Sequence, residues 1–140
     1  MRPAVFLDTS AWFAALNEHE DRHAQAAAYY RQAIAQGGFS LVTTNLVLAE
    51  MYALLRRRQG ARPAIAFLDR VHEDPRHDVV WVTRDLARRA VDRWLRPFSD
   101  HRFSLTDAVG FEVMHERGLT TAFATDGHFT IAGFETVPAP

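Results

Sequence analysis

A chain of 140 residues with a net charge of −1 has the size of one domain, which hides roughly two-thirds of its unfolded-chain surface and so holds a real core. The absence of cysteine excludes disulfides, thiolate zinc sites and a cysteine nucleophile, and the absence of lysine excludes Walker A and Schiff-base chemistry. No apolar run approaches the ~20 residues of a membrane span and no secretory segment opens the chain, so we expect a soluble, cytoplasmic protein.

Strands and helices are predicted to alternate along the chain. Short apolar runs predict strands at 4–7, 39–43, 79–82 and 121–124, with a short fifth strand at 134–137. Helical patterns, with Gly, Pro and hydroxyl residues near their ends, predict helices at 11–16, 24–36, 46–58, 63–71, 85–96 and 104–117. This alternation predicts one α/β domain over residues 1–140, built on a parallel sheet that helices cover.

Asp8 directly follows the first predicted strand. In open parallel sheets the ligand crevice lies outside the carboxyl ends of the strands, which places Asp8 where chemistry usually occurs. An equally simple interpretation is that Asp8 forms an Asx turn or caps the next helix. Position alone does not decide between the two.

Glu50 lies on the apolar stripe of helix 46–58. The helical neighbours three and four positions away are all apolar: Leu46, Val47, Ala53 and Leu54. A carboxylate on a buried stripe must be paired, protonated or bound to a metal, because leaving it unpaired costs several kcal/mol. We therefore favour a functional role for Glu50.

Asp107 and Asp126 each have a structural explanation. Ser104 to Asp107 fits a capping box, and Asp126-Gly127 is a common turn pair. Their placement nevertheless favours a functional role. Asp126 follows a buried strand and Asp107 lies in the first turn of the preceding helix, so their carboxylates can meet Asp8 at one edge of the sheet. Such a cluster of like charges needs a hard divalent cation, Mg²⁺ or Mn²⁺.

Four short motifs together resemble the PIN-domain family. They are Val5-Phe6-Leu7-Asp8-Thr9-Ser10, Leu48-Ala49-Glu50, Phe103-Ser104-Leu105-Thr106-Asp107-Ala108, and Ala122-Phe123-Ala124-Thr125-Asp126-Gly127-His128-Phe129 with Gly133-Phe134. Their order and spacing agree along nearly the whole chain. The compact length is most similar to the VapC-like toxins of prokaryotic toxin–antitoxin pairs.

The resemblance implies a single PIN-like domain with a twisted parallel sheet of four to five strands, flanked by helices on both faces. It implies a Mg²⁺-dependent endoribonuclease, with Mn²⁺ as a possible substitute, that leaves 5′-phosphate and 3′-hydroxyl ends. RNA is then the substrate, an antitoxin protein the partner, and a homodimer the expected assembly. The residues implied as catalytic and metal-binding are Asp8, Glu50, Asp107 and Asp126, with Thr9, Ser10 and Thr106 as supporting polar groups. The family often has a basic residue where this chain has Gly127, which leaves open whether His128 supplies a phosphate contact.

Other interpretations of the sequence stay open. His19-Glu20-Asp21-Arg22-His23 matches the zinc-protease motif H-E-x-x-H, although it lies in a polar segment rather than on an established helix. A PIN-like nuclease of RNA processing, or a PIN-like module that binds RNA or a partner without cutting, also fits. Candidate phosphate contacts are Arg56, Arg57, Arg58, Arg84, Arg88, Arg89 and Arg102, most of which we expect on solvated helix faces.

Aromatic residues are expected mainly in the core. Trp81 falls in a predicted buried strand and Trp94 on an apolar helix face, and Phe129 and Phe134 are also core candidates. Trp12, one turn past Asp8, is the exception, because its position favours a place in the wall of the site.

Overall fold

The structure, a computed structural model, describes residues 3–140, so the first two residues of the predicted 1–140 domain lie outside the described part. Its strands are β1 (Ala4–Leu7), β2 (Ser40–Thr44), β3 (His77–Val80), β4 (Thr121–Phe123) and β5 (Glu135–Val137). Its helices are α1 (Thr9–Leu16), α2 (His23–Tyr29), α3 (Asn45–Gln59), α4 (Ala61–Glu73), α5 (Arg84–Ala90), α6 (Leu105–Arg117) and α7 (His128–Ile131), with π-helical turns η1 (Tyr30–Ile34) and η2 (Val91–Leu95) extending α2 and α5.

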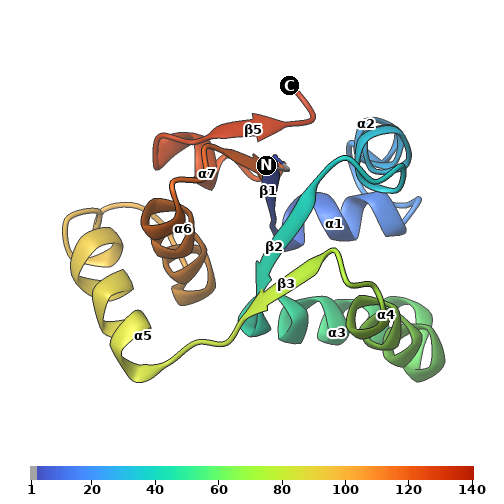
Figure 1. Cartoon of the computed structure of the whole chain (residues 1–140), viewed down its shortest axis with the longest axis horizontal. Helices are drawn as coiled ribbons and strands as arrows, with labels where there is room; N and C mark the ends of the chain where they lie inside the picture. Colours follow the sequence, from blue (N-terminus) through green and yellow to red (C-terminus); the bar gives the residue numbers. More distant parts are fainter. Residues whose placement is uncertain (1–2) are drawn as a thin grey trace.

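All neighbouring strands of the sheet run parallel, in the order β3-β2-β1-β4-β5. Phe6 in the central strand β1 lies opposite Val42 of β2 and Ala122 of β4. Helices α1 to α4 lie to one side of the sheet and α5 and α6 to the other (Figure 1). This confirms the predicted parallel sheet of four to five strands with helices on both faces.

The strand order reverses between β1 and β4. From β1 the chain first adds β2 and β3 on one side, and later β4 and β5 on the other. Such a switch point opens a crevice outside the carboxyl ends of the two central strands, because the connections leave them in opposite directions. Asp8 follows β1, and Asp126 lies three residues beyond the end of β4. The fold thus brings two of the predicted carboxylates to this crevice.

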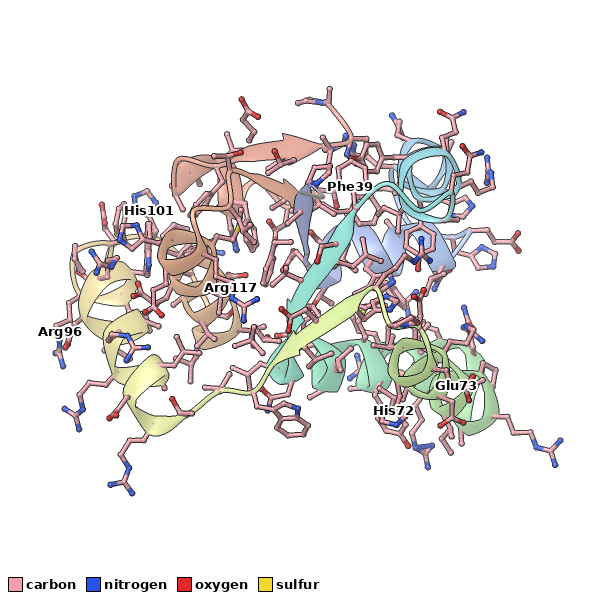
Figure 2. The ribbon with its side chains drawn as sticks, in the orientation of Figure 1. Phe39, His72, Glu73, Arg96, His101 and Arg117 are labelled. Atoms are coloured by element: carbon pink, nitrogen blue, oxygen red, sulfur yellow. The ribbon has the colours of Figure 1, made fainter. Side chains whose placement is uncertain are left out.

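Hydroxyl side chains cap three of the helices, and the sequence predicted this for Ser104. Thr44, Thr83 and Ser104 each accept a hydrogen bond from a backbone N–H in the first turn of the next helix, which satisfies one of the donors left free there. At the other end of α6, Arg117 forms an ion pair with Asp78 of β3, and Figure 2 shows Arg117 between these two elements. This ion pair therefore links α6 to β3, which is an edge strand of the sheet.

The third strand lies earlier than predicted, at 77–80 rather than 79–82. Trp81 therefore follows the strand and is 71% exposed, so its predicted burial is wrong. The physical reason is that the ladder ends at Val80, and the N–H of Val82 turns to the side chain of Asn45 instead. The sequence pattern of the edge strand does not show where its pairing stops.

Trp12 does not form a wall of the site, contrary to our expectation. Its side chain is fully buried and lies against Phe67 of α4 and His77 of β3, with ring centroids 4.9 Å and 6.0 Å apart. Trp94 and Phe129 are buried as predicted, and Phe134 packs partly buried against the same core. Within residues 3–140 no helix combines the length and the apolar character needed to cross a membrane.

Candidate metal centre

An open pocket of about 280 Å³ lies at the carboxyl ends of β1 and β4. It is lined by Asp8, Thr9, Ser10, Glu50, Arg102, Ser104, Asp107, Asp126 and His128. The structure thus brings the four predicted carboxylates together, from α3, from α6 and from the segments after β1 and β4. Thr9 and Ser10 also line this pocket, whereas Thr106 is not among its lining residues.

Asp8 is both the cap of α1 and a wall of the pocket. Its Oδ2 accepts the backbone N–H of Ser10 at 3.1 Å and the Ser10 hydroxyl at 2.6 Å. Burial, followed by the negative charge of Asp126, raises the pKa of Asp8 to about 7, although the hydrogen bonds from Ser10 oppose this shift. Without a cation, this carboxylate therefore titrates near neutral pH. Asp8 therefore fits both interpretations that the sequence left open, because it caps α1 and also lines the pocket.

Ser10 connects the two central strand ends. While its hydroxyl donates to Asp8, its Oγ accepts the backbone N–H of Thr125 at 2.9 Å. The N–H of Asp8 also donates to the carbonyl of Phe123 at 3.1 Å. These bonds hold the segment that precedes Asp126 against the start of α1.

Glu50 is half-buried rather than buried on the apolar stripe, which corrects our expectation. The buried face of α3 consists of Val47, Met51 and Leu55, so Glu50 lies beside that face and opens toward the pocket. Its Oε1 accepts the hydroxyl hydrogen of Thr9 at 2.7 Å. Thr9 is therefore a partner of Glu50 from a distant part of the chain. It is a neutral hydroxyl 41 positions away, and no local sequence pattern reveals it.

Asp107 is fixed by the capping box that the sequence predicts. The backbone N–H of Ser104 donates to its Oδ2 at 2.9 Å, while its own N–H donates to Ser104 Oγ at 3.0 Å. The residue is only 7% exposed. Its carboxylate consequently has little freedom to reorient when the pocket is filled.

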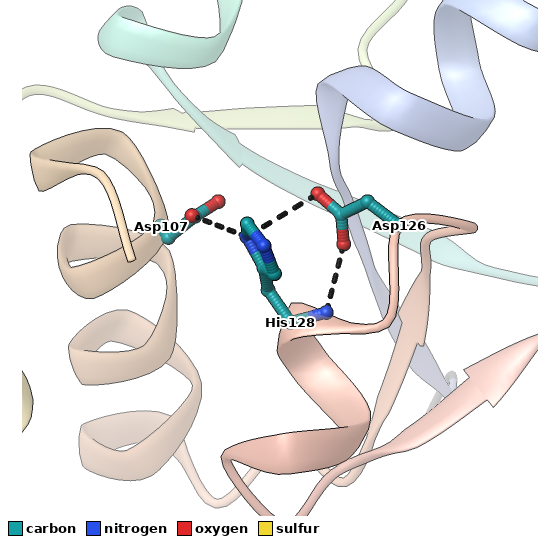
Figure 3. A group of neighbouring side chains, drawn as sticks. All are labelled: Asp107, Asp126 and His128. Carbon is teal, nitrogen blue, oxygen red and sulfur yellow. Dashed lines mark hydrogen bonds and ion pairs between the residues drawn. The ribbon is translucent and has the colours of Figure 1, made fainter. Parts of the chain in front are cut away.

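His128 joins Asp107 and Asp126 in the pocket, as Figure 3 shows. Its Nδ1 lies 2.8 Å from Asp107 Oδ2 and 3.7 Å from Asp126 Oδ2, and its backbone N–H donates to Asp126 Oδ1 at 3.0 Å. Burial lowers the pKa of His128, but the hydrogen bond to Asp107 and the charges of Asp126, Asp107 and Asp8 outweigh it, so this pKa is raised. Burial also raises the pKa of Asp126, against the opposing contacts from His128.

Sequence reasoning placed less weight on His128 and Arg102 than the structure does. The signal for His128 was its position two residues after Asp126, where an Asx turn in front of a short helix directs the ring back over the carboxylate. Arg102 was one of several arginines with equal weight. Its distinction, a place on the lip of the acidic pocket, depends on the loop between η2 and α6.

The metalloprotease hypothesis is wrong, because His19 and His23 do not share a helix. His19 precedes α2 with a side chain 81% exposed, whereas His23 begins α2 and its Nδ1 contacts the carbonyl of Ala14 at 2.6 Å. The zinc-protease motif requires both imidazoles on one face of a formed helix.

The donor set of the acidic pocket fits a divalent cation. Among the lining residues four carboxylates face only His128 and Arg102 as basic groups, and the charges of Asp126 and Asp107 add to the effect of burial in raising the pKa of Asp8. One ligand atom each from Asp107, Asp126 and His128 lies within 4.8 Å of the others. Carboxylate oxygens in this number are typical of sites for hard divalent ions.

The fold and this pocket define a class of protein. A family model for the PIN domain matches residues 5–135, and the chain belongs to the PIN-domain family. This confirms the resemblance that the four motifs indicated. Nucleases of this family generally depend on divalent metal ions.

Among individual proteins, the chain is similar to the 23S rRNA-specific endonuclease VapC20 of Mycobacterium tuberculosis. The two are 36% identical over 133 residues, which cover 95% of this chain and 97% of the relative, in both strains CDC 1551 and H37Rv. The crystal structure of M. tuberculosis VapC20, a toxin that cleaves the sarcin–ricin loop, matches with a TM-score of 0.82 and 35% identity over 94% of this chain and 96% of that one.

Two more distant structures share the fold at 13% identity and a TM-score of 0.66. They are VapBC2 from Rickettsia felis bound to a DNA fragment from its promoter, over 95% of this chain and 96% of that one, and FitAcB from Neisseria gonorrhoeae, over 94% and 95%.

Proposed function

We propose that this protein is a metal-dependent endoribonuclease and the toxin of a type II toxin–antitoxin pair. The observation that supports this most is the convergence of Asp8, Glu50, Asp107 and Asp126 on one open pocket, in a chain 36% identical to an RNA-cleaving toxin along almost its full length. In this proposal residues 1–140 act as one PIN domain in the cytoplasm, where the RNA substrate is found.

These four carboxylates are the proposed ligands of Mg²⁺, with Mn²⁺ as a substitute. When bound, the ion activates a water molecule and offsets the negative charge that develops on the phosphate. The chain contributes by orientation: Ser10 fixes Asp8, Thr9 fixes Glu50, and the N–H of Ser104 fixes Asp107. No protein nucleophile is required, and none of the lining residues is a cysteine or lysine.

Arg102 is the proposed contact for an RNA phosphate beside the scissile bond. It lies on the lip of the pocket, opposite in charge to the four carboxylates, and its exposed side chain is accessible to a strand entering from solvent. Such a contact offsets the repulsion between the acidic pocket and the RNA backbone. The sarcin–ricin loop of 23S rRNA, which VapC20 cleaves, is the first substrate to test.

An antitoxin protein and a second copy of this chain are the proposed partners. Helix α4 exposes Ile65 to 49%, and Leu48 and Tyr52 of α3 are only partly buried. Apolar side chains on adjacent helices are typical of surfaces that a partner covers. An RNA-processing nuclease without an antitoxin, and a module that binds RNA without cutting, are the alternatives that experiment must separate.

The test is cleavage of a sarcin–ricin hairpin and of total RNA with Mg²⁺ present or chelated. We expect 5′-phosphate products from wild type, and loss of cleavage by at least about 100-fold in Asp8→Asn and Glu50→Gln, because each removes a charged ligand. Matched controls are Asp100→Asn and Glu18→Gln, whose side chains are 85% and 79% exposed and lie outside the pocket.

Equal activity of the pocket variants and the controls would contradict the proposal. Tight RNA binding by pure wild-type protein, without cleavage of any RNA, would favour the binding module instead. Co-purification with the product of an adjacent small reading frame, and inhibition by it, is expected of a toxin and not of a processing nuclease.

A further inference from the structure

His128 differs in donor chemistry from every other group that lines the pocket. Among the lining residues in the described part of the chain, it alone offers a nitrogen lone pair, because the Arg102 guanidinium stays protonated and the rest present oxygen. Its ring lies between Asp107 and Asp126 rather than outside them (Figure 3). One ligand atom of His128 therefore lies within 4.8 Å of an oxygen of each carboxylate.

The distances around His128 fall in the range that separates the ligands of one bound ion. With bonds of about 2.1 Å, adjacent ligands of an octahedral ion lie roughly 3 Å apart and opposite ligands roughly 4.2 Å apart. His128 Nδ1 lies 2.8 Å from Asp107 Oδ2 and 3.7 Å from Asp126 Oδ2. Small shifts therefore suffice to place an ion among these three atoms, and the proton between Nδ1 and Oδ2 then leaves to solvent.

The imidazole is also held in position by contacts other than those with carboxylate oxygens. Its ring meets Phe103 edge to face, with centroids 5.7 Å apart, and the residue begins α7. Phe103 in turn packs against the buried ring of Phe111 at 4.9 Å. These ring contacts restrict the rotation of the imidazole beside the two carboxylates.

We infer that His128 is itself a ligand of the divalent cation, together with Asp107 and Asp126, and that it shifts the preference of the site from Mg²⁺ toward Mn²⁺. Mg²⁺ favours a shell of oxygen atoms, whereas imidazole suits transition metals. The inference rests on the proposed function, since it concerns the same pocket, but it assigns a ligand and a metal preference that the four carboxylates alone do not give.

A direct test is the electron spin echo modulation spectrum of substoichiometric Mn²⁺ bound to the full chain, which reports ¹⁴N nuclei bonded to the ion. We expect ¹⁴N coupling in wild type and its loss in His128→Phe, which keeps the aromatic contact with Phe103 and has no donor atom. His128→Gln, which offers oxygen only, must lose the coupling as well, and it serves if the Phe variant does not fold.

His101→Gln is the matched control. His101 stacks on the same Phe103 ring at 5.5 Å but does not line the pocket, and Figure 2 shows it on the α5 and α6 side. Its replacement must leave the ¹⁴N coupling unchanged. In parallel calorimetric titrations, we expect His128→Phe to lose roughly 10- to 100-fold in Mn²⁺ affinity and much less in Mg²⁺ affinity.

The spectrum and the titrations together distinguish failure of the His128 assignment from failure of the proposed function. Mn²⁺ that binds with no ¹⁴N coupling, or with coupling that persists in both His128 variants, would overturn the ligand assignment and leave the carboxylate site intact. Failure of wild type to bind either ion at millimolar concentration would overturn the proposed function together with the assignment. An equal loss of Mn²⁺ and Mg²⁺ affinity in His128→Phe would overturn the metal preference.

Discussion

Thr9 donates its hydroxyl hydrogen to Oε1 of Glu50 at 2.7 Å, although the two residues are 41 positions apart. This bond restricts the rotation of the Glu50 carboxylate. Partners that orient a metal ligand typically affect metal affinity or activity by 10- to 100-fold.

We therefore expect Thr9→Val to lower the rate of RNA cleavage by roughly 10-fold or more at limiting Mg²⁺, while Thr9→Ser retains most of it. The isosteric valine preserves volume, so thermal stability should change little. Rates measured across a Mg²⁺ titration test this, and a Thr9→Val enzyme with the wild-type Mg²⁺ dependence would show that the bond has no role in the site.

The pKa of Asp8, about 7 in the folded chain against an ordinary 3.8, predicts how stability depends on pH without metal. Because the folded state binds the proton more tightly, the stabilising contribution is fully present below pH 3.8 and is lost as pH rises through 7. The raised pKa of His128 acts in the same direction, since its contribution is likewise lost as pH rises.

In EDTA we expect the melting temperature to fall between about pH 4 and pH 7, with a shallower fall in Asp8→Asn. Added Mg²⁺ must raise the melting temperature most at the alkaline end, because it binds the ionised carboxylate. Scanning calorimetry over this range, with and without Mg²⁺, provides the measurement. Identical pH slopes in Asp8→Asn and wild type would show that Asp8 does not titrate there.

Arg102 and Arg96 form a matched pair for testing the phosphate contact. Arg102 lies on the lip of the acidic pocket, whereas the Nε of Arg96 is paired with Asp92 at 2.9 Å on the outer side of the molecule (Figure 2). In an Asp8→Asn background that does not cleave, we expect Arg102→Ala to weaken RNA binding by roughly 10-fold. The slope of log affinity against log salt should fall by about 0.7 to 1.

Arg96→Ala should leave both the affinity and the slope within error, because its charge lies away from the strand. Fluorescence anisotropy at several salt concentrations measures both quantities. If the two variants weaken binding equally, the arginines act only through the overall charge of the chain.

Glu112 is a fully buried carboxylate that ties η2 to α6. Its Oε1 accepts the indole N–H of Trp94 at 3.0 Å and the Nε of Arg93 at 2.8 Å. Glu112→Ala leaves the buried indole N–H without its partner and should lower the free energy of unfolding by about 2 to 4 kcal/mol.

The control is Glu116→Ala, one helical turn after Glu112, which removes a partly exposed ion pair with Arg89. This change should lower the free energy of unfolding by less than about 1 kcal/mol. Urea unfolding of both variants gives the comparison. Similar losses in the two would mean that burial of Glu112 adds nothing to the value of its contacts.

Features that short apolar runs and helix caps determine were predicted most reliably from the sequence. Asp8 and Asp126 were located because each comes after a buried strand, and Asp107 because it lies in the first turn of the helix that precedes the last of these strands. These are local patterns, and the parallel arrangement of the strands then brings the three carboxylates to one edge of the sheet.

Features that depend on contacts between distant segments were not predicted. Trp12 is buried rather than in the wall of the site, because α4 covers it, and Trp81 is exposed rather than buried, because the β2–β3 ladder ends before it. Glu50 was taken to lack a partner because Thr9 is far away along the chain. His128 gained its importance from the turn that directs its ring between two carboxylates.

The pairing of β1 with β4 has a consequence during protein synthesis. Asp8 leaves the ribosome long before Asp126 is translated, 118 residues later, and the hydrogen bond from Thr125 to Ser10 forms only after β4 has docked. A nascent chain that still lacks β4 therefore has an incomplete acidic pocket, without Asp126 and His128. The order of strands in the sheet thus delays completion of the metal centre until the chain is nearly finished.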